Sequence, residues 1–204
     1  MATNKHQIAN LALSRIGSTK FVTDFDTDAT AEARAIKQIY DLILDDILEA
    51  VRPQFALRRA TLVEDTASTH ADVEWAYKYS LPSALVCIVG LENAAGRLVR
   101  SDQRLAYALE HDGTKQVLMT DEADAVLIYV YRETTTTLYP PSFTSALAWQ
   151  LAAELARSIK VSARLAAEAD RMALIAIMEA RAQAESQGET GGEPLPAELA
   201  ARNS

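Results

Sequence analysis

The chain has 204 residues, which suffices for one domain of ordinary size or for a domain that carries a sizeable insertion. Hydrophobic residues make up 49% of the chain, and its 7 glycines and 6 prolines are too few for a fibrous or disordered protein. The formal net charge of −8, with 20 scattered basic residues, argues against the positively charged surface with which a protein follows the phosphates of DNA.

Cysteine usage and hydropathy indicate the compartment in which the chain works. The single cysteine, Cys87, excludes an intramolecular disulfide and fits a reducing, cytosolic environment. The N-terminus has no apolar signal core. Uninterrupted apolar stretches stay below the ~18 residues of a membrane span, so we expect no contact with a membrane.

Two amphipathic helices are predicted near the N-terminus. The first covers residues 4–16, and Asn4 with Gln7 three residues later resembles a capping box. We expect the second to begin near Asp28 as its capping residue and to end or bend at Pro53. Its apolar residues form a stripe wider than a single seam: Ala29, Ala33, Ile36, Ile39, Tyr40, Leu42, Ile43, Leu44, Ile47, Leu48 and Ala50. Such a helix is expected to be covered on more than one side.

The hydrophobic period changes in the middle of the chain. Residues 54–62 favour one or two further helical turns, and the polar stretch 63–72 then marks a boundary. Apolar, β-rich or alternating strings follow: WAYKYS, ALVCIVGL, LAYALEHDGTKQVLMT and AVLIYVYRET. Asp112 and Gly113 in the third string are a strong hairpin signal. We therefore predict a small antiparallel sheet over about residues 73–133, with a helix over 101–110 as the alternative there.

The C-terminal part predicts helices again, from Ser142 to about Gln187. Its apolar residues follow a helical spacing that changes register: Phe143, Leu147, Leu151, Leu155 and Ile159, then Leu165, Met172, Ile175 and Met178. We predict a break at 160–162, with Ser162 capping the second helix of an antiparallel pair. One uninterrupted helix is the alternative.

These elements predict an α+β fold that is mainly helical. Residues 1–66 and 138–187 form a helical bundle from two N-terminal helices and a long C-terminal helical pair. Residues 67–137 form an inserted, small antiparallel β domain. Residues 188–204 form an extended C-terminal tail that is too polar to fold alone and that carries one apolar residue, Leu195, between two prolines.

Residues that could carry out chemistry are few and scattered. The three histidines have no second histidine or cysteine at metal-ligand spacing, and Cys87 lies in an apolar strand where nothing lowers its pKa. Asp41, Asp45 and Glu49 share one face of the second helix without a lysine or histidine beside them. We interpret this acidic face as solvated, with a surface for a basic partner as the alternative. We expect no enzyme activity, no metal and no cofactor.

The order of segments resembles a known family. The strings IANLALSRIG, AEARAIKQIYDLILDDILEAVRPQFALRRATL, WAYKYSLPSAL, LIYVYRET and LYPPSFTSALAWQLAAELARSI carry this resemblance over about residues 5–187. The matching positions are Ala33, Arg34, Tyr40, Asp41, Phe55, Ala56, Tyr79, Leu81, Pro82, Tyr129, Arg132, Phe143 and Ala146. The chain departs from the pattern at 52–54, where relatives often place a tryptophan. It resembles the tail tubular protein A and head-tail adaptor family of tailed bacteriophages, whose members are also called head-completion or connector proteins.

The resemblance implies a structural role in the virion at the head-tail junction, for a protein made in the host cytoplasm. Identical subunits, about twelve of them, form a closed ring through heterologous contacts. The ring binds the portal protein on one side and a tail or nozzle protein on the other. Double-stranded DNA passes through it without sequence-specific binding, which suits an acidic chain.

Two sets of residues are assigned to these contacts. The subunit interface is expected on the second helix, at Arg34, Tyr40, Ile47 and Leu48. The tail is expected to dock on the portal through Pro194, Leu195, Pro196 and Leu199, whereas an unattached terminus is the alternative. A nucleic-acid-associated helical protein and an enzyme of an unrecognised helical class remain the alternative functions.

Overall fold

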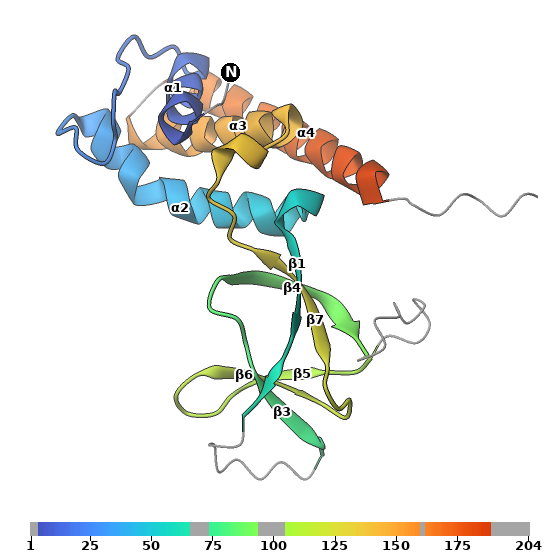
Figure 1. Ribbon diagram of the computed structural model, residues 1–204. Helices are drawn as coiled ribbons and strands as arrows, with labels where there is room; N and C mark the ends of the chain where they lie inside the picture. Colours follow the sequence, from blue (N-terminus) through green and yellow to red (C-terminus); the bar gives the residue numbers. More distant parts are fainter. Residues whose placement is uncertain (1–3, 66–73, 94–104, 160–161, 189–204) are drawn as a thin grey trace, which may run out of the picture.

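The computed structural model describes residues 4–65, 74–93, 105–159 and 162–188, and it has a helical part next to a β part (Figure 1). The helices are α1 (Lys5–Arg15), α2 (Ala31–Val51), α3 (Pro141–Ser158) and α4 (Ala163–Gly188), with short 3-10 turns η1 (Gln54–Ala56) and η2 (Thr136–Leu138). The strands are β1 (Leu57–Thr61), β2 (Val63–Glu64), β3 (Tyr77–Ser80), β4 (Leu85–Glu92), β5 (Ala108–His111), β6 (Gln116–Thr120) and β7 (Val126–Tyr131). This confirms the predicted α+β, mainly helical fold.

The ends of the first two helices follow from local hydrogen bonds. The predicted capping box is present in α1, where Gln7 N–H donates to Asn4 Oδ1 over 2.8 Å and Asn4 N–H donates to Gln7 Oε1 over 3.0 Å. The prediction that Asp28 caps α2 is wrong. Thr30 is the capping residue and accepts from Ala33 N–H, while the Asp28 carboxylate accepts the N–H groups of the preceding loop.

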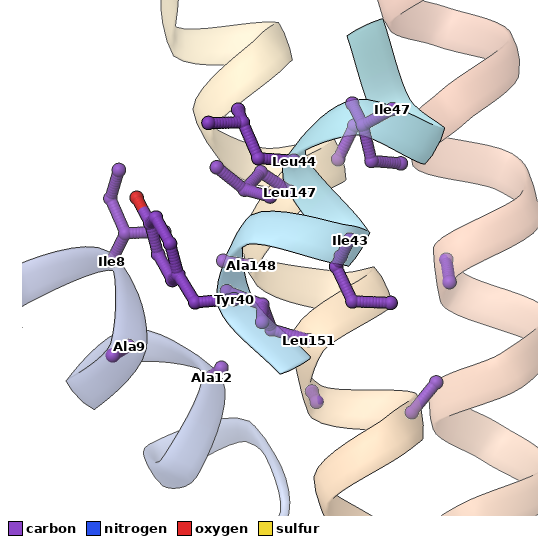
Figure 2. Packing of buried hydrophobic residues seen from close by; sticks show 14 of the residues in the cluster. Ile8, Ala9, Ala12, Tyr40, Ile43, Leu44, Ile47, Leu147, Ala148 and Leu151 are labelled. Atoms are coloured by element: carbon purple, nitrogen blue, oxygen red, sulfur yellow. The ribbon is translucent and has the colours of Figure 1, made fainter. Parts of the chain in front are cut away.

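The core of the helical part lies where α1, α2 and α3 meet (Figure 2). Figure 2 labels its buried side chains: Ile8, Ala9 and Ala12 of α1, Tyr40, Ile43, Leu44 and Ile47 of α2, and Leu147, Ala148 and Leu151 of α3. The helix α3 is central, because it packs against α1, α2 and α4. Most of the wide apolar stripe of α2 is thus covered by other helices of the same chain, whereas Leu42 and Ala50 stay exposed.

The C-terminal pair is two helices, as predicted. The helix α3 ends at Ser158 and α4 begins at Ala163, where Leu165 N–H donates to Ser162 Oγ over 3.4 Å. The two helices run antiparallel along each other (Figure 1). Ser162 therefore caps α4 as expected, and the alternative of one uninterrupted helix is wrong.

The buried face of α4 differs from the prediction. Its buried apolar residues are all alanines: Ala169, Ala173, Ala176, Ala180 and Ala184. By contrast Leu165 and Ile175 are each 39% exposed and Met178 is 63% exposed. Small residues let two helices approach closely, so α4 packs on α3 through its alanine stripe and turns larger apolar side chains outward.

The β part holds two antiparallel sheets rather than one. The strand orders are β1-β7-β4 and β2-β3-β6-β5. The hairpin signal is confirmed, since β5 and β6 pair through His111 and Gln116 around a turn where Gly113 has φ +98°. Residues 108–111 are a strand, so the helix alternative is wrong there, and 94–104 lie outside the described residues.

The sheet begins earlier than predicted. Residues 54–62 were expected to continue the helix, but only η1 is helical and Leu57–Thr61 form β1. This strand pairs with β7, with Leu57 opposite Val130 and Thr61 opposite Val126. Pairing with a strand so distant in the chain outweighs the local helical preference, and it moves the boundary of the β part from 67 to 57.

Candidate functional site

The predicted acidic face of α2 contains one residue that is tied to the β part. Asp45 accepts a hydrogen bond of 2.7 Å from Arg132 Nε, and Arg132 Nη2 forms a second bond to the other carboxylate oxygen. This hydrogen-bonded carboxylate raises the pKa of Arg132. Asp41 and Glu49 are exposed. Asp45 therefore joins α2 to the residue after β7, whereas Asp41 and Glu49 lie on the surface.

We expect Asp45→Asn to lower the free energy of unfolding by roughly 0.5–1 kcal/mol, because it removes the charge from a two-bond contact that stays partly exposed. Asp46→Asn is the matched control, since Asp46 is exposed on the same helix. Urea unfolding of both variants measures the difference. Equal stability of the two variants would show that the Arg132 contact contributes nothing.

A second junction connects the β part to α3, and sequence reasoning missed it. The Glu133 carboxylate accepts Arg58 Nη2 over 2.9 Å and Thr135 N–H over 3.0 Å. Tyr139 Oη donates to the Glu133 carbonyl oxygen over 2.6 Å. Hydrogen bonds from Thr135, with help from Arg58, hold the pKa of Glu133 below its ordinary value although burial acts the other way. These contacts join Arg58 of β1 to the residues on either side of η2, and the partnership with the distant Arg58 is one that no local pattern reveals.

The predicted subunit-interface residues do not form one surface. Tyr40, Ile47 and Leu48 are only 5%, 1% and 0% exposed, because α1, α3 and α4 of the same chain cover them. Their assignment to the subunit interface is therefore wrong. Arg34 is exposed and remains available to a partner. Coverage by several helices of one chain accounts for the buried part of the α2 stripe.

Large apolar residues are instead exposed on the outer sides of α2 and α4. Leu42 of α2 is 62% exposed. On α4, Leu174 is 62%, Ile175 is 39% and Met178 is 63% exposed. Ile175 and Met178 come one and four residues after Leu174, so the three side chains form a single patch opposite the alanine stripe. Grouped exposed apolar side chains of this kind mark interaction surfaces more often than isolated ones do.

One group of possible metal ligands occurs in the described ranges, at the N-terminal end of α1: His6, Asp24 and Asp26. His6 Nδ1 accepts the N–H of Phe25 over 3.4 Å, and His6 Nε2 lies 3.7 Å from Asp24 Oδ1. The Lys5 ammonium group binds the Asp26 carboxylate. These pairings fasten the loop before α2 to α1.

Two other candidate residues, His111 and Cys87, lie in surroundings that favour a structural role over a chemical one. His111 Nδ1 accepts Gly113 N–H over 3.1 Å inside the hairpin turn. Burial raises the pKa of the Cys87 thiol, so it stays protonated and is a poor nucleophile. His70 lies outside the described residues.

A hollow of 380 Å³ lies between the C-terminal ends of α2 and α4. Its lining consists of Glu49, Ala50, Val51, Arg52, Gln54, Arg181, Ala184 and Glu185. Arg181 Nε and Glu185 Oε1 form an ion pair over 2.9 Å there. This lining pairs opposite charges and holds no histidine, cysteine or serine that could act as a base or nucleophile.

The predicted portal-docking residues Pro194, Leu195, Pro196 and Leu199 lie outside the described residues. Within the described ranges, none of the helices combines the length and the apolar character that crossing a bilayer requires. Comparison with protein-family models finds no match to this chain, and comparison with curated proteins finds none either.

Proposed function

We propose that this chain is a structural head-to-tail connector of a bacteriophage virion. In this role, identical copies form a ring between the portal protein and a tail or nozzle protein, and double-stranded DNA passes through the channel of the ring. The observation that carries the proposal is the resemblance in segment order over about residues 5–187 to head-tail adaptor proteins. The acidic chain supports it, because DNA slides past a surface that offers few cationic contacts.

The placement of the resembling residues supports the same role. Phe55 of η1 and Phe143 of α3 meet edge to face with ring centroids 5.0 Å apart. Arg132, another matching position, holds α2 through Asp45. These residues lie where the helical part joins the β part. The positions that carry the resemblance therefore include contacts that hold the two parts together.

Imaging by negative-stain electron microscopy tests the proposal directly. The full chain is purified alone and together with a phage portal protein. We expect a ring added coaxially to the portal. A folded chain that neither forms a ring nor binds the portal would contradict the connector function.

Removal of residues 189–204 tests the docking role of the tail. We expect the truncated chain to lose portal binding while keeping its circular dichroism spectrum and unfolding curve, because the helical part ends before this segment. A milder variant, Leu195→Ser, is expected to weaken portal binding in the same direction. Unchanged binding of the truncated chain would contradict the docking role while leaving the ring untouched.

A further inference from the structure

The outer face of α4, defined by Leu174, Ile175, Met178 and Ala182, stays uncovered within the described part of the chain. Leu174 and Met178 are 62% and 63% exposed, and Ile175 is 39% exposed. Ala182 follows Met178 by four residues and is also exposed, so the apolar face continues toward the C-terminal end of the helix. A grouped apolar surface of this kind favours a segment that can cover it.

The charges around this face do not select an occupant. Exposed side chains of both signs flank the apolar residues: Arg164, Glu168, Arg171, Glu179 and Glu185. Because cations and anions are mixed there, a strongly charged partner of either sign gains little. The apolar side chains therefore define what packs on the face.

The C-terminal tail, residues 189–204, has a short route back to this face. It lies outside the described residues and directly follows Gly188, the last residue of α4. Met178 lies ten residues before Gly188, which is about 15 Å along the helix. Leu195 lies seven residues after Gly188, and an extended chain of that length spans up to about 23 Å. Two adjacent glycines at 191–192 permit the reversal of direction, so the tail is long enough to return.

The tail also carries apolar side chains at a matching interval. Its two leucines, Leu195 and Leu199, are four residues apart, and Leu174 and Met178 are likewise four residues apart. One helical turn in each segment spaces such a pair by about 6 Å. With the direction of the chain reversed, Leu195 would lie toward the end of α4 and Leu199 toward Leu174. Each leucine would then meet the apolar face.

The hollow at the same end of α4 is a poorer site for these leucines. Four of its eight lining residues carry a charge: Glu49, Arg52, Arg181 and Glu185. A leucine placed there would remove water from charged groups without replacing their hydrogen bonds. The outer face of α4 offers exposed apolar side chains instead.

We propose that in the free chain the C-terminal tail folds back and covers the outer face of α4 with Leu195 and Leu199, and that portal binding withdraws it. Both leucines belong to the residues assigned to portal docking, so the α4 face and the portal compete for the same side chains. The apolar face would then be uncovered only on the portal, where further copies assemble. The covered state concerns the free chain alone, whereas its release rests on the proposed function.

The covered state must be weak enough for the portal protein to withdraw the tail. We expect covered and uncovered molecules in comparable numbers, which corresponds to an equilibrium constant of about 1 and stabilises the folded chain by only RT ln 2. Such a small contribution agrees with the unchanged unfolding curve that we expect for the truncated chain.

Methyl NMR of the free full chain tests the covered state. We expect the methyl signals of Ile175 and Met178 to shift in a variant with Leu195→Ser and Leu199→Ser, because the leucines no longer cover them. Leu165 is the matched control, since it is 39% exposed near the other end of α4 and its signals should stay in place. Unchanged signals of Ile175 and Met178 would overturn the inference. Wild-type signals that move toward those of the variant on dilution would assign the face to a second copy and would overturn it as well.

Cysteine cross-linking tests the release by the portal. In a Cys87→Ser background, a chain with Ala182→Cys and Ala197→Cys is treated with a short bifunctional maleimide, and the intramolecular product is followed by mass spectrometry. We expect the product to form about fivefold more slowly when Leu195→Ser and Leu199→Ser are added, because the tail is then held near α4 only by its tether. The portal-bound chain should show the same slow rate without the serine substitutions.

The outcomes separate this inference from the connector function. Equal cross-linking rates with and without the two leucines would overturn the covered state, even if rings form on the portal and the connector function stands. A covered tail in a chain that binds no portal would support the covered state and contradict the connector function. A portal-bound chain that cross-links as fast as the free chain would overturn the release.

Discussion

Phe143→Ala is expected to lower the free energy of unfolding by about 3–5 kcal/mol, the usual cost of replacing a buried phenylalanine by alanine. Phe143 is 1% exposed and lies in the first turns of α3. Its ring contacts those of Phe55 and Tyr139, each with centroids 5.0 Å away. Loss of this ring removes apolar burial and leaves a cavity beside Phe55 of η1 and Tyr139, the residue after η2.

Chemical denaturation monitored by circular dichroism measures the loss. Phe21→Ala is the matched control, because Phe21 is 62% exposed in the loop before α2 and its removal should change stability by less than about 0.5 kcal/mol. A loss at Phe143 as small as that at Phe21 would contradict the view that the aromatic cluster holds the two parts together. Phe143→Leu should recover part of the stability, since most of the volume returns.

Ala173→Leu is expected to destabilise the fold by about 1–3 kcal/mol through overpacking. Ala173 is 2% exposed at the middle of the alanine stripe that joins α4 to the core. An isobutyl group in place of a methyl group would force α4 away from α3, which would weaken the neighbouring alanine contacts as well.

The control for this prediction uses the same substitution on the same helix. Ala167 is exposed, so Ala167→Leu should be nearly neutral for stability. Thermal unfolding of both variants, at concentrations where the chain is monomeric, measures the difference. Equal melting temperatures for the two variants would show that α4 does not pack closely on α3 through this stripe.

The two junctions give the helical and β parts a fixed relation that suits a structural component. The contact between Asp45 and Arg132 joins α2 to the end of β7. The contacts of Glu133 with Arg58 and Tyr139 join the sheet to the segment that leads into α3. In the proposed ring each subunit must keep its faces at a constant angle, so contacts that resist motion between the two parts would favour assembly.

Features that depend on neighbours in the sequence were predictable from the sequence alone. The Asn4 and Gln7 capping box, the start of α4 behind Ser162 and the hairpin around Asp112 and Gly113 each need only a few adjacent residues. The fold class followed from the change in hydrophobic period along the chain. Composition and charge likewise indicated a chain with a sizeable core and no strongly basic surface.

Tertiary structure alone decided the rest, because those features depend on residues that are distant in the chain. The stretch Leu57–Thr61 is a strand since β7 pairs with it. Hydrophobic periodicity marks the largest apolar residues of α4 as core, but the apolar residues that α4 buries completely are alanines. For the same reason the apolar stripe of α2 could not reveal which of its residues stay exposed. Only the packed chain separates the buried Tyr40, Ile47 and Leu48 from the exposed Leu42.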